Sequence, residues 1–501
     1  MSDRENQIIN KLISLLGVDN VLTEPEHRFV YSHFGEFGIK SLSEPLAVIR
    51  LGKNDETRLA DLLEDSGIKV VQSDHREEIE ESQEPYLLVD VEKPITINDL
   101  TDRLHELDEK RGELKQNLKE APSFSHWMTS SLQGKDGFQL VEKDEDVGFC
   151  VVQSYFDDIQ TYSSKGRLLL AKGYLNGELE ESTLLSKSIF SCTACGQCYD
   201  QVSLDSLEIN NLIIKTRNKI TQHGNGPKKF NTALNNIQQN GNPAGLPSED
   251  RTIWIEEQVD EHPYKDNPVL FWPGCTTSYR LPELVKDTCE ILVEAGYDFG
   301  LLGDNEGCCG LILYLSGHWD EAKSNGEKIL EQLGGVKRLV TNCSGCYYCF
   351  SRIYPKLGLT VTFEVVHTSQ IIKESIQDQR LQLKEHQGSY MWHDPCDLGR
   401  HCNVYEPPRY VLNSIPGLKL VEPSLSLEHS ICCGAGGGLW MYNEELTNHV
   451  SQMKLSETLP ENIDGIITGC PTCLLSLRNT ARDKTPFLGV MDIVEIVKSC
   501  I

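Results

Sequence analysis

Short runs of apolar residues alternate with longer amphipathic segments along the C-terminal two thirds of the chain. Four of the short runs predict buried strands, each followed by a cysteine at a turn: 268–274, 337–342, 389–395 and 465–469. Segments 281–296 and 444–459 carry apolar residues at helical spacing and predict helices. Strands that alternate with helices favour parallel sheets, which place their ligands at the carboxyl ends of the strands.

The N-terminal region shows a similar alternation. Residues 47–51 and 68–72 predict strands and residues 55–67 predict the helix between them, which gives a βαβ unit. Segment 98–120 has helical spacing and mixed charges and predicts a solvated helix. Residues 221–250 are rich in Gly, Asn and Pro and predict a linker.

The cysteines follow an internal repeat. The first 149 residues contain none of the 18 cysteines, and ten of those that follow form two copies of a five-thiol pattern. Corresponding cysteines lie 121 to 127 residues apart, so one unit occurs twice. We call the two patterns the pentads. The first pentad is Cys275, Cys308, Cys309, Cys343 and Cys346, and the second is Cys396, Cys432, Cys433, Cys470 and Cys473.

Length and charge narrow the class of protein. The chain has 501 residues and a formal net charge of −28, which argues against a nucleic acid as the main partner. The polar amino terminus lacks the pattern of a secretory signal, and no apolar run has the length that spans a bilayer. We therefore expect a cytoplasmic protein whose closely spaced thiols serve metal or redox chemistry.

The spacing of each pentad favours iron–sulfur ligation. A C-x-x-C at a strand-to-helix turn presents two sulfurs on one side, where the helix amino terminus stabilises thiolate charge. A vicinal pair of cysteines aims poorly at one tetrahedral ion, so zinc is the weaker alternative, and disulfides or inert buried thiols are weaker still. Gly310 and Gly434 follow the vicinal pairs and let backbone N–H groups approach a bound cofactor.

These motifs carry a resemblance to a known family. The segments WHDPCDLGRH (392–401), EPPRYVLNSIPG (406–417), ICCGAGGG (431–438) and GCPTC (469–473) resemble the cysteine-rich CCG domain pair of heterodisulfide reductase catalytic subunits. Residues 241–254 are similar to the connector that precedes the first such domain in one of these subunits. The resemblance implies that each pentad binds a catalytic noncubane four-iron cluster, and that the two clusters face one cavity across a pseudo-twofold axis.

A third cysteine motif precedes the pentads. Cys192, Cys195 and Cys198 have the C-x2-C-x2-C spacing of a bacterial ferredoxin, but Val202 stands where the fourth cysteine is expected. Three outcomes stay open: a three-iron relay cluster, a four-iron cluster completed by a remote group, or no cluster. The remaining cysteines could complete it or be buried as small hydrophobic residues, and they are Cys150, Cys289, Cys349, Cys402 and Cys500.

The N-terminus resembles a different family. Residues 15–35 and 45–71 resemble the opening subdomain of FAD-linked glycolate and lactate oxidases. Where those oxidases carry a glycine-rich pyrophosphate loop, this chain has QSDHREEIEE (72–81), whose carboxylates would repel pyrophosphate. We therefore expect a remnant docking domain that binds no FAD.

The fold class expected is a multidomain protein of α/β and α+β type. Module boundaries are expected near residues 185 and 265. The divisions predicted are an N-terminal α/β docking domain (1–150), a small helical ferredoxin-like module with linker (151–265), and two tandem CCG α/β domains (266–385 and 386–501).

Two functional classes follow. The first is a subunit that reduces a small disulfide or oxidises thiols, fed by a flavoprotein, a ferredoxin or a membrane cytochrome that could attach it to a membrane. The second is an iron–sulfur electron-transfer subunit of a flavin-dependent hydroxy-acid oxidase, with a redox sensor or scaffold as a minor alternative. Polar side chains near the motifs could bind substrate, deliver protons or be purely structural, and they are His367, His393, Arg400 and His401.

Overall fold

The fold is taken from a computed structural model that describes residues 3–33, 47–50, 69–72, 86–90, 150–198 and 206–501. The described residues form two compact units. One unit comprises Met1–Ile189 with Cys198–Leu204, and the other comprises Phe190–Gln197 with Asp205–Ile501. In the described part of the chain, no helix combines the length and the apolar character needed to cross a membrane.

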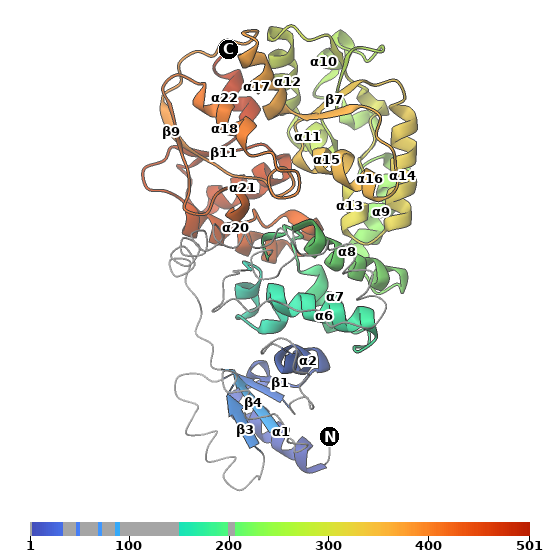
Figure 1. Cartoon of the computed structure of the whole chain (residues 1–501), viewed down its shortest axis with the longest axis vertical. Coiled ribbons are helices and arrows are strands. Elements are labelled where there is room, and N and C mark those ends of the chain that lie inside the picture. The colour runs from blue at the N-terminus through green and yellow to red at the C-terminus, as the bar shows by residue number, and fades with distance from the viewer. Residues whose placement is uncertain (1–2, 34–46, 51–68, 73–85, 91–149, 199–205) are drawn as a thin grey trace, which may run out of the picture. The chain divides into compact units, whose positions relative to one another are not determined.

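The N-terminal unit contains a four-stranded sheet in the order β1-β2-β4-β3. Its strands are β1 (Val21–Leu22), β2 (Ala47–Arg50), β3 (Lys69–Gln72) and β4 (Tyr86–Asp90). Strand β1 is antiparallel to β2 and the other pairs are parallel. Helices α1 (Asp3–Leu16) and α2 (Pro25–His33) contact this sheet (Figure 1). Both predicted strands are confirmed, whereas the helices predicted at 55–67 and 98–120 and residues 73–81 lie outside the described residues.

Along the sequence, the residues between this sheet and the first pentad form mainly helices. They are α6 (Ser164–Asn176), α7 (Thr183–Phe190), α8 (Ser206–Gln222), α9 (Lys228–Asn240) and α10 (Glu256–Glu261). The prediction of a linker over 221–250 is wrong for α9. Its apolar Phe230, Ala233 and Ile237 share one helical face and are buried, so packing outweighs the Asn-rich composition.

The first of the two domains that resemble CCG domains contains a parallel sheet in the order β6-β5-β7-β8. Its strands are β5 (Val269–Phe271), β6 (Phe299–Gly300), β7 (Arg338–Thr341) and β8 (Glu364–His367). The helices are α11 (Cys275–Arg280), α12 (Pro282–Glu294), α13 (Leu311–Leu315), α14 (Trp319–Gln332), α15 (Ser344–Tyr348), α16 (Tyr354–Lys356) and α17 (Thr368–Gln377).

The second CCG domain repeats this topology in a parallel sheet of order β10-β9-β11-β12. Its strands are β9 (Gly388–Trp392), β10 (Leu418–Val421), β11 (Gly465–Thr468) and β12 (Gly489–Asp492). The helices are α18 (Glu406–Asn413), α19 (Leu439–Tyr442), α20 (Glu444–Thr458), α21 (Pro471–Lys484) and α22 (Ile493–Lys498). All four strands and both helices predicted in the repeats are confirmed, as is the duplication.

Helices at the junction of the two CCG domains pair reciprocally. Helix α12 of the first domain packs on α22 of the second, and α18 of the second packs on α17 of the first. Ion pairs join Lys498 to Glu290 and Lys373 to Glu406, so equivalent lysines 125 residues apart serve both contacts. One buried apolar core includes Phe271 of the first domain and Trp392 of the second, which makes the junction part of the core.

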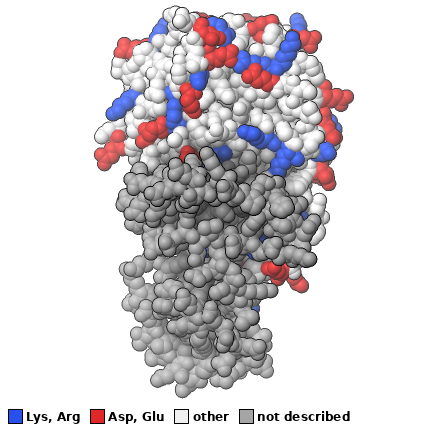
Figure 2. Space-filling view, viewed as in Figure 1, with Lys and Arg blue, Asp and Glu red and all other residues white. Residues whose placement is uncertain are grey.

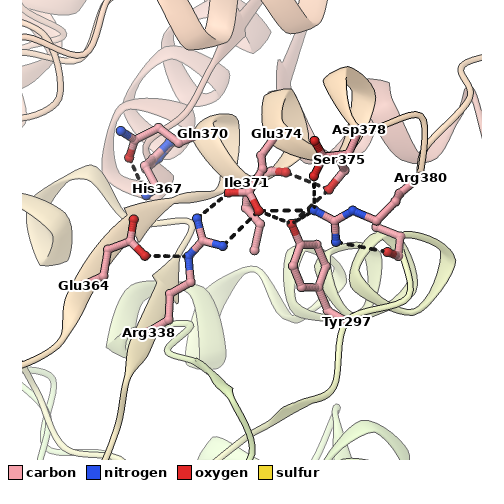
Figure 3. Close-up of polar contacts among 11 residues, drawn as sticks. Tyr297, Arg338, Glu364, His367, Gln370, Ile371, Glu374, Ser375, Asp378 and Arg380 are labelled. Carbon is pink, nitrogen blue, oxygen red and sulfur yellow. Dashed lines mark hydrogen bonds and ion pairs between the residues drawn. The ribbon is translucent and has the colours of Figure 1, made fainter.

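A polar network fixes α17 to the first sheet (Figure 3). Arg338 on β7 donates from Nη1 to Glu374 Oε1 at 3.0 Å and pairs through Nε with Glu364 at 3.0 Å. Arg380 donates to the Tyr297 hydroxyl at 2.6 Å. Elsewhere on the visible face of the CCG domains, basic and acidic side chains are interspersed (Figure 2).

Candidate metal centres

The first pentad lies at the carboxyl ends of β5 and β7. Cys275 begins α11 just after β5, and Cys343 is the N-terminal cap of α15 just after β7. Cys346 lies within the first turn of α15, as the predicted strand-to-helix turn requires. The Cys308–Cys309 pair precedes α13 in a loop. The fold therefore brings together the five thiols that are scattered over 72 residues of sequence.

The five sulfurs of the first pentad form a continuous series of contacts. Cys275 Sγ lies 3.9 Å from Cys308 Sγ, and Cys346 Sγ lies 3.5 Å from Cys309 Sγ. Hydrogen bonding links Cys308 to its neighbour Cys309 and Cys343 to Cys346. Three of the five side chains are buried and the other two are partly buried.

The second pentad reproduces this series. Cys396 is hydrogen-bonded to Cys432, Cys432 to Cys433, Cys433 to Cys473 and Cys473 to Cys470. Cys470 caps the N-terminus of α21, as Cys343 caps α15. None of the 18 cysteines forms a disulfide. The structure therefore brings each predicted set together as free thiols.

Backbone amides approach both pentads at the predicted glycines. The N–H of Gly310 donates to Cys308 Sγ and that of Gly434 donates to Cys432 Sγ, both at 3.4 Å. Both glycines have positive φ, of 81° and 86°. A Cβ on Gly434 would lie 2.5 Å from the Thr447 carbonyl oxygen. These positions admit the amide to the sulfur only when no side chain is present.

Close packing of the thiols perturbs their acidity. The hydrogen bond with Cys308, together with burial, raises the pKa of Cys275 well above its usual range. The pKa of Cys396 is raised in the same way by Cys432 and by burial. In contrast, hydrogen bonds from Cys432 and Cys473 hold the pKa of Cys433 well below its usual range. The thiols of each pentad thus share their protons, and a cation or metal is needed to hold several thiolates together.

Buried N–H groups without hydrogen-bond partners in the described part of the chain surround the sulfurs. They are Trp272 Nε1, Arg251 Nε and Nη2, Lys454 Nζ and the single N–H of the neutral His393 ring. A His393 nitrogen and the sulfurs of Cys433 and Cys473 lie within 4.8 Å of one another. A buried donor without an acceptor costs free energy unless an anionic group satisfies it. The donors and thiols therefore fit a sulfide-bridged iron cluster, whose thiolate ligands and sulfides are acceptors.

A buried arginine approaches each pentad, with different partners. Arg251 forms an ion pair at 2.8 Å with Glu306, whose carboxylate also accepts from the Gly274 N–H at 2.9 Å. Burial raises the pKa of Glu306 to about 7 even though Arg251 acts to lower it. Arg400 instead donates to three carbonyl oxygens, those of Cys195, Glu428 and Ser430. The first arginine is neutralised by an acid, whereas these three contacts of the second are all with neutral groups.

Two of the candidate histidines are held by the backbone. His367 caps α17, where Nδ1 accepts from the Ser369 N–H and Nε2 bonds the Gly469 carbonyl at 2.9 Å. His401 bonds the Ala194 carbonyl at 3.0 Å and stacks on Tyr348. These contacts account for the burial of the His367 ring, whereas His401 Nδ1 has no hydrogen-bond partner among the described residues, and a His401 nitrogen lies within 4.8 Å of a Cys396 sulfur and an Asp397 carboxylate oxygen.

The two pentads lie next to each other across the domain junction. Ser344 follows Cys343, and its hydroxyl donates at 2.7 Å to the carbonyl of Gly469, the residue before Cys470. Asp397, which follows Cys396, has a carboxylate oxygen 3.6 Å from where a Cβ would stand on Gly345, between Cys343 and Cys346. Residues adjoining one pentad therefore contact residues adjoining the other.

The ferredoxin-like motif is divided between the two compact units. Cys192 and Cys195 belong to the same unit as the pentads and Cys198 to the N-terminal unit. Cys195 is hydrogen-bonded to Cys432 of the second pentad. Of the other cysteines, Cys349 donates to the Cys309 carbonyl and Cys500 to the Ile496 carbonyl, and Cys150 accepts from Arg167. The relay cluster and its fourth ligand stay predictions.

Sequence reasoning missed several of the buried residues around the pentads. Lys454 lies on the helix predicted at 444–459. Its position on the same face as buried residues of that helix is the only feature of the sequence that could have indicated that its side chain is buried. Arg251 lies in the connector at 241–254, and Glu306 lies two residues before Cys308. The contact between Cys195 and Cys432 spans 237 residues and has no local signal in the sequence.

Known proteins resemble this chain over the same regions. A family model described as the cysteine-rich domain CCG matches residues 269–351 and 390–478, which hold one pentad each. A subunit of the dihydromethanophenazine:CoB–CoM heterodisulfide reductase from Methanosarcina barkeri is 31% identical over 350 residues, which cover 68% of this chain and 83% of that protein. The probable iron–sulfur-binding oxidoreductase FadF of Bacillus subtilis is 30% identical, and the match covers 64% of this chain and 48% of that protein. One subunit of the fumarate reductase (CoM/CoB) from Methanothermobacter marburgensis is 27% identical, and the match covers 62% of both chains.

Proposed function

The chain belongs to the family of CCG-domain iron–sulfur oxidoreductases that includes the matched subunit of heterodisulfide reductase, and from this we propose that it reduces a small disulfide within a complex of several subunits. The same centre would oxidise the two thiols in the reverse direction. One observation carries the proposal: both pentads are complete, and the fold brings the sulfurs of each together.

Under this proposal the ten pentad cysteines hold two iron–sulfur clusters of the noncubane four-iron type. When bound, such clusters supply single electrons and a Lewis-acidic iron. The amides of Gly310 and Gly434 and the buried N–H groups of Trp272 and His393 stabilise the thiolate charge. Burial of the pentads excludes bulk water from the sulfurs and strengthens each of these contacts.

The paired arrangement matches the stoichiometry of the reaction. Reduction of a disulfide breaks one S–S bond, consumes two electrons and two protons, and gives two thiols. Each pentad would serve one of the two substrate sulfurs, because residues adjoining the two sets are in contact through Ser344 and Gly469. Cys192, Cys195 and Cys198 would hold a relay cluster that receives electrons from a flavoprotein, ferredoxin or membrane cytochrome subunit.

A second candidate function rests on the N-terminal region and on one relative. The chain would then carry electrons for a flavin-dependent hydroxy-acid oxidase without reducing a disulfide itself. The resemblance of residues 15–35 and 45–71 to such oxidases supports this candidate, and β2 and β3 agree with the expected strand positions. The likeness to the EtfAB:quinone oxidoreductase of Syntrophomonas wolfei, which is 28% identical, supports an electron-transfer role.

The test is replacement of one vicinal cysteine in each pentad in the full chain, purified without oxygen. We expect Cys309→Ser and Cys433→Ser each to remove a cluster's share of iron and acid-labile sulfide and to abolish disulfide reduction. Cys500→Ser is the matched control, because a serine hydroxyl can keep the hydrogen bond to the Ile496 carbonyl. Full iron and full turnover in Cys309→Ser and Cys433→Ser would contradict the proposal.

Paramagnetic resonance with and without an added thiol separates the two functions. A cluster signal that changes when the thiol binds supports catalysis at the pentads. A cluster signal that ignores the thiol but responds to a reduced flavin partner supports the electron-transfer function. Protein without iron in either experiment would exclude both.

A further inference from the structure

Lys454 is a buried cation that belongs to the second pentad alone. Its side chain has 0% exposure on α20, and Nζ has no hydrogen-bond partner in the described part of the chain. A lysine is rarely buried without a partner, since an unpaired ammonium loses its hydration. Its position therefore requires a negative group nearby.

Helix α20 carries Lys454 on the face that covers the second pentad. On this face, Val450 and the Thr447 carbonyl pack against Gly434, the residue after the vicinal cysteines. One turn before Lys454, Ser451 accepts at 2.8 Å from Thr480 on α21, the helix that holds Cys473. The ammonium therefore lies between the two elements that supply the sulfurs.

The charged groups around Lys454 show that those sulfurs help to balance its positive charge. Burial lowers the pKa of Lys454 to about 8, while Asp394 and the thiols of Cys433, Cys432 and Cys473 act to raise it. Asp394 is already engaged by Arg409, through two contacts of 2.8 Å, and by the Trp392 indole N–H. Arg409 is shared with Glu422, so Asp394 keeps part of its negative charge, and Lys454 is balanced by Asp394 together with the thiolates of the second pentad.

Among the described residues, the first pentad has no such cation. On α14 the buried position 125 residues before Lys454 is Ile329, and this displacement falls within the range of the repeat. Arg251 is neutralised by Glu306. In the second copy Asp397, which is hydrogen-bonded to Cys396, offsets Arg400, so Lys454 is the further buried cation whose charge acts on the sulfurs.

We propose that Lys454 makes the two iron–sulfur sites unequal by holding the second at the higher reduction potential, so that the first electron from the partner subunit resides there. An added electron is a negative charge, which a buried ammonium stabilises strongly at low dielectric. Cys195 of the relay motif contacts Cys432 of this same site, so the favoured site is also in contact with the relay motif. The proposal rests on the presence of two clusters in the proposed function.

The test is a redox titration of the full chain, followed by paramagnetic resonance under anaerobic conditions. We expect Lys454→Met to keep the wild-type iron content and to lower one of the two midpoint potentials. The expected change in the reduction equilibrium is at least tenfold, which corresponds to about 59 mV for one electron. The reciprocal variant Ile329→Lys should raise the other midpoint.

The matched control is Lys356→Met. Lys356 is an exposed lysine at the end of α16, and its ammonium contacts the side chains of Asn211 and Tyr314 rather than thiols. Both midpoint potentials should stay at their wild-type values in this variant. A shift equal to that of Lys454→Met would show that the loss of a lysine charge away from the thiols perturbs the clusters just as much, and would overturn the proposal.

Two further substitutions separate charge from packing. Lys454→Arg keeps the charge and should keep the wild-type midpoints, whereas Lys454→Gln should behave like Lys454→Met and replaces it if the latter fails to fold. Unchanged midpoints in the uncharged variants, or equal shifts in the Arg and Gln variants, would overturn the proposal. Wild-type protein that binds no iron would instead refute the proposed function on which it rests.

Discussion

The two CCG domains share topology and sulfur positions but differ in the buried polar residues around the sulfurs. The first domain surrounds its pentad with Trp272, Ile329 and the Arg251–Glu306 pair. The second places His393, Lys454 and Arg400 around its pentad. Duplication has kept the elements that position the thiols, while the electrostatic surroundings have diverged.

This difference has a physical basis in how buried charge is balanced. A buried ion pair such as Arg251–Glu306 neutralises itself, so its net field at the nearby sulfurs is small. A single ammonium such as Lys454, which has no hydrogen-bonded acid among the described residues, acts on the sulfurs as well as on Asp394. Two sites with the same cysteine ligands can therefore differ in the net charge of their surroundings. Substitutions in the two copies test this difference.

The largest expected effect is at Arg251. Arg251→Met leaves the buried Glu306 carboxylate without its cation, which should destabilise the first CCG domain by about 3–5 kcal/mol. The double variant Arg251→Met/Glu306→Gln should recover most of this loss, because it removes the orphaned charge. Urea unfolding of the anaerobic full chain, followed by near-ultraviolet circular dichroism, measures both.

The comparison is sharpened by Arg400→Met in the second domain. Three backbone carbonyls accept from this arginine, and neutralising Asp397 cannot restore those hydrogen bonds, so Arg400→Met/Asp397→Asn should recover less of the loss than the double variant at Arg251 and Glu306. If the double variant at Arg251 and Glu306 is no more stable than Arg251→Met alone, the ion pair does not balance the charge of the first site.

A smaller difference is expected between the glycines after the vicinal cysteines. Gly434→Ala should cost about 2–4 kcal/mol, since its Cβ meets a backbone oxygen of α20 and φ is positive. Gly310→Ala should cost about 1–2 kcal/mol, since its Cβ meets only the movable Asn325 side chain. Unfolding midpoints and iron content of the two variants test this order. Equal losses would show that strain at positive φ, rather than the clash, sets the cost.

The smallest effect is expected at the two equivalent lysines of the domain junction. Lys498→Met and Lys373→Met each remove one partly exposed ion pair, so each should change the free energy of unfolding by about 0–1 kcal/mol. The part of each change that comes from the ion pair should vanish at high salt, and Lys373→Met should cost slightly more because Lys373 also lies 5.4 Å from the centre of the Tyr410 ring. A loss above about 2 kcal/mol in only one variant would show that the reciprocal helix contacts are not equivalent.

Much of the CCG fold could be predicted from sequence. The strands before Cys275, Cys343, Cys396 and Cys470 are short apolar runs whose pattern survives in both copies. The pentads could be predicted because a cysteine thiol can bind metal in any local structure. The spacing of the cysteines was therefore informative before the fold was known. Because the unit occurs twice, each element predicted in one copy could be compared with the corresponding element of the other copy.

The rest depended on tertiary packing. Lys454 is a polar residue on an amphipathic helix, and such a residue is usually exposed. Only the fold shows that this part of α20 is covered by α21 and the Cys432–Gly434 loop. Helix α9 was not predicted because its composition is rich in Asn, which favours turns. In the fold, the burial of three apolar residues outweighs that preference.

The reciprocal helix pairs at the domain junction also constrain the order of folding during synthesis. Helices α12 and α17 leave the ribosome before the helices of the second domain that cover them. The partner of α12 is α22, which ends three residues before residue 501. The first domain therefore stays partly uncovered until α22 has been made, and we expect a nascent chain stopped before α22 to need a chaperone.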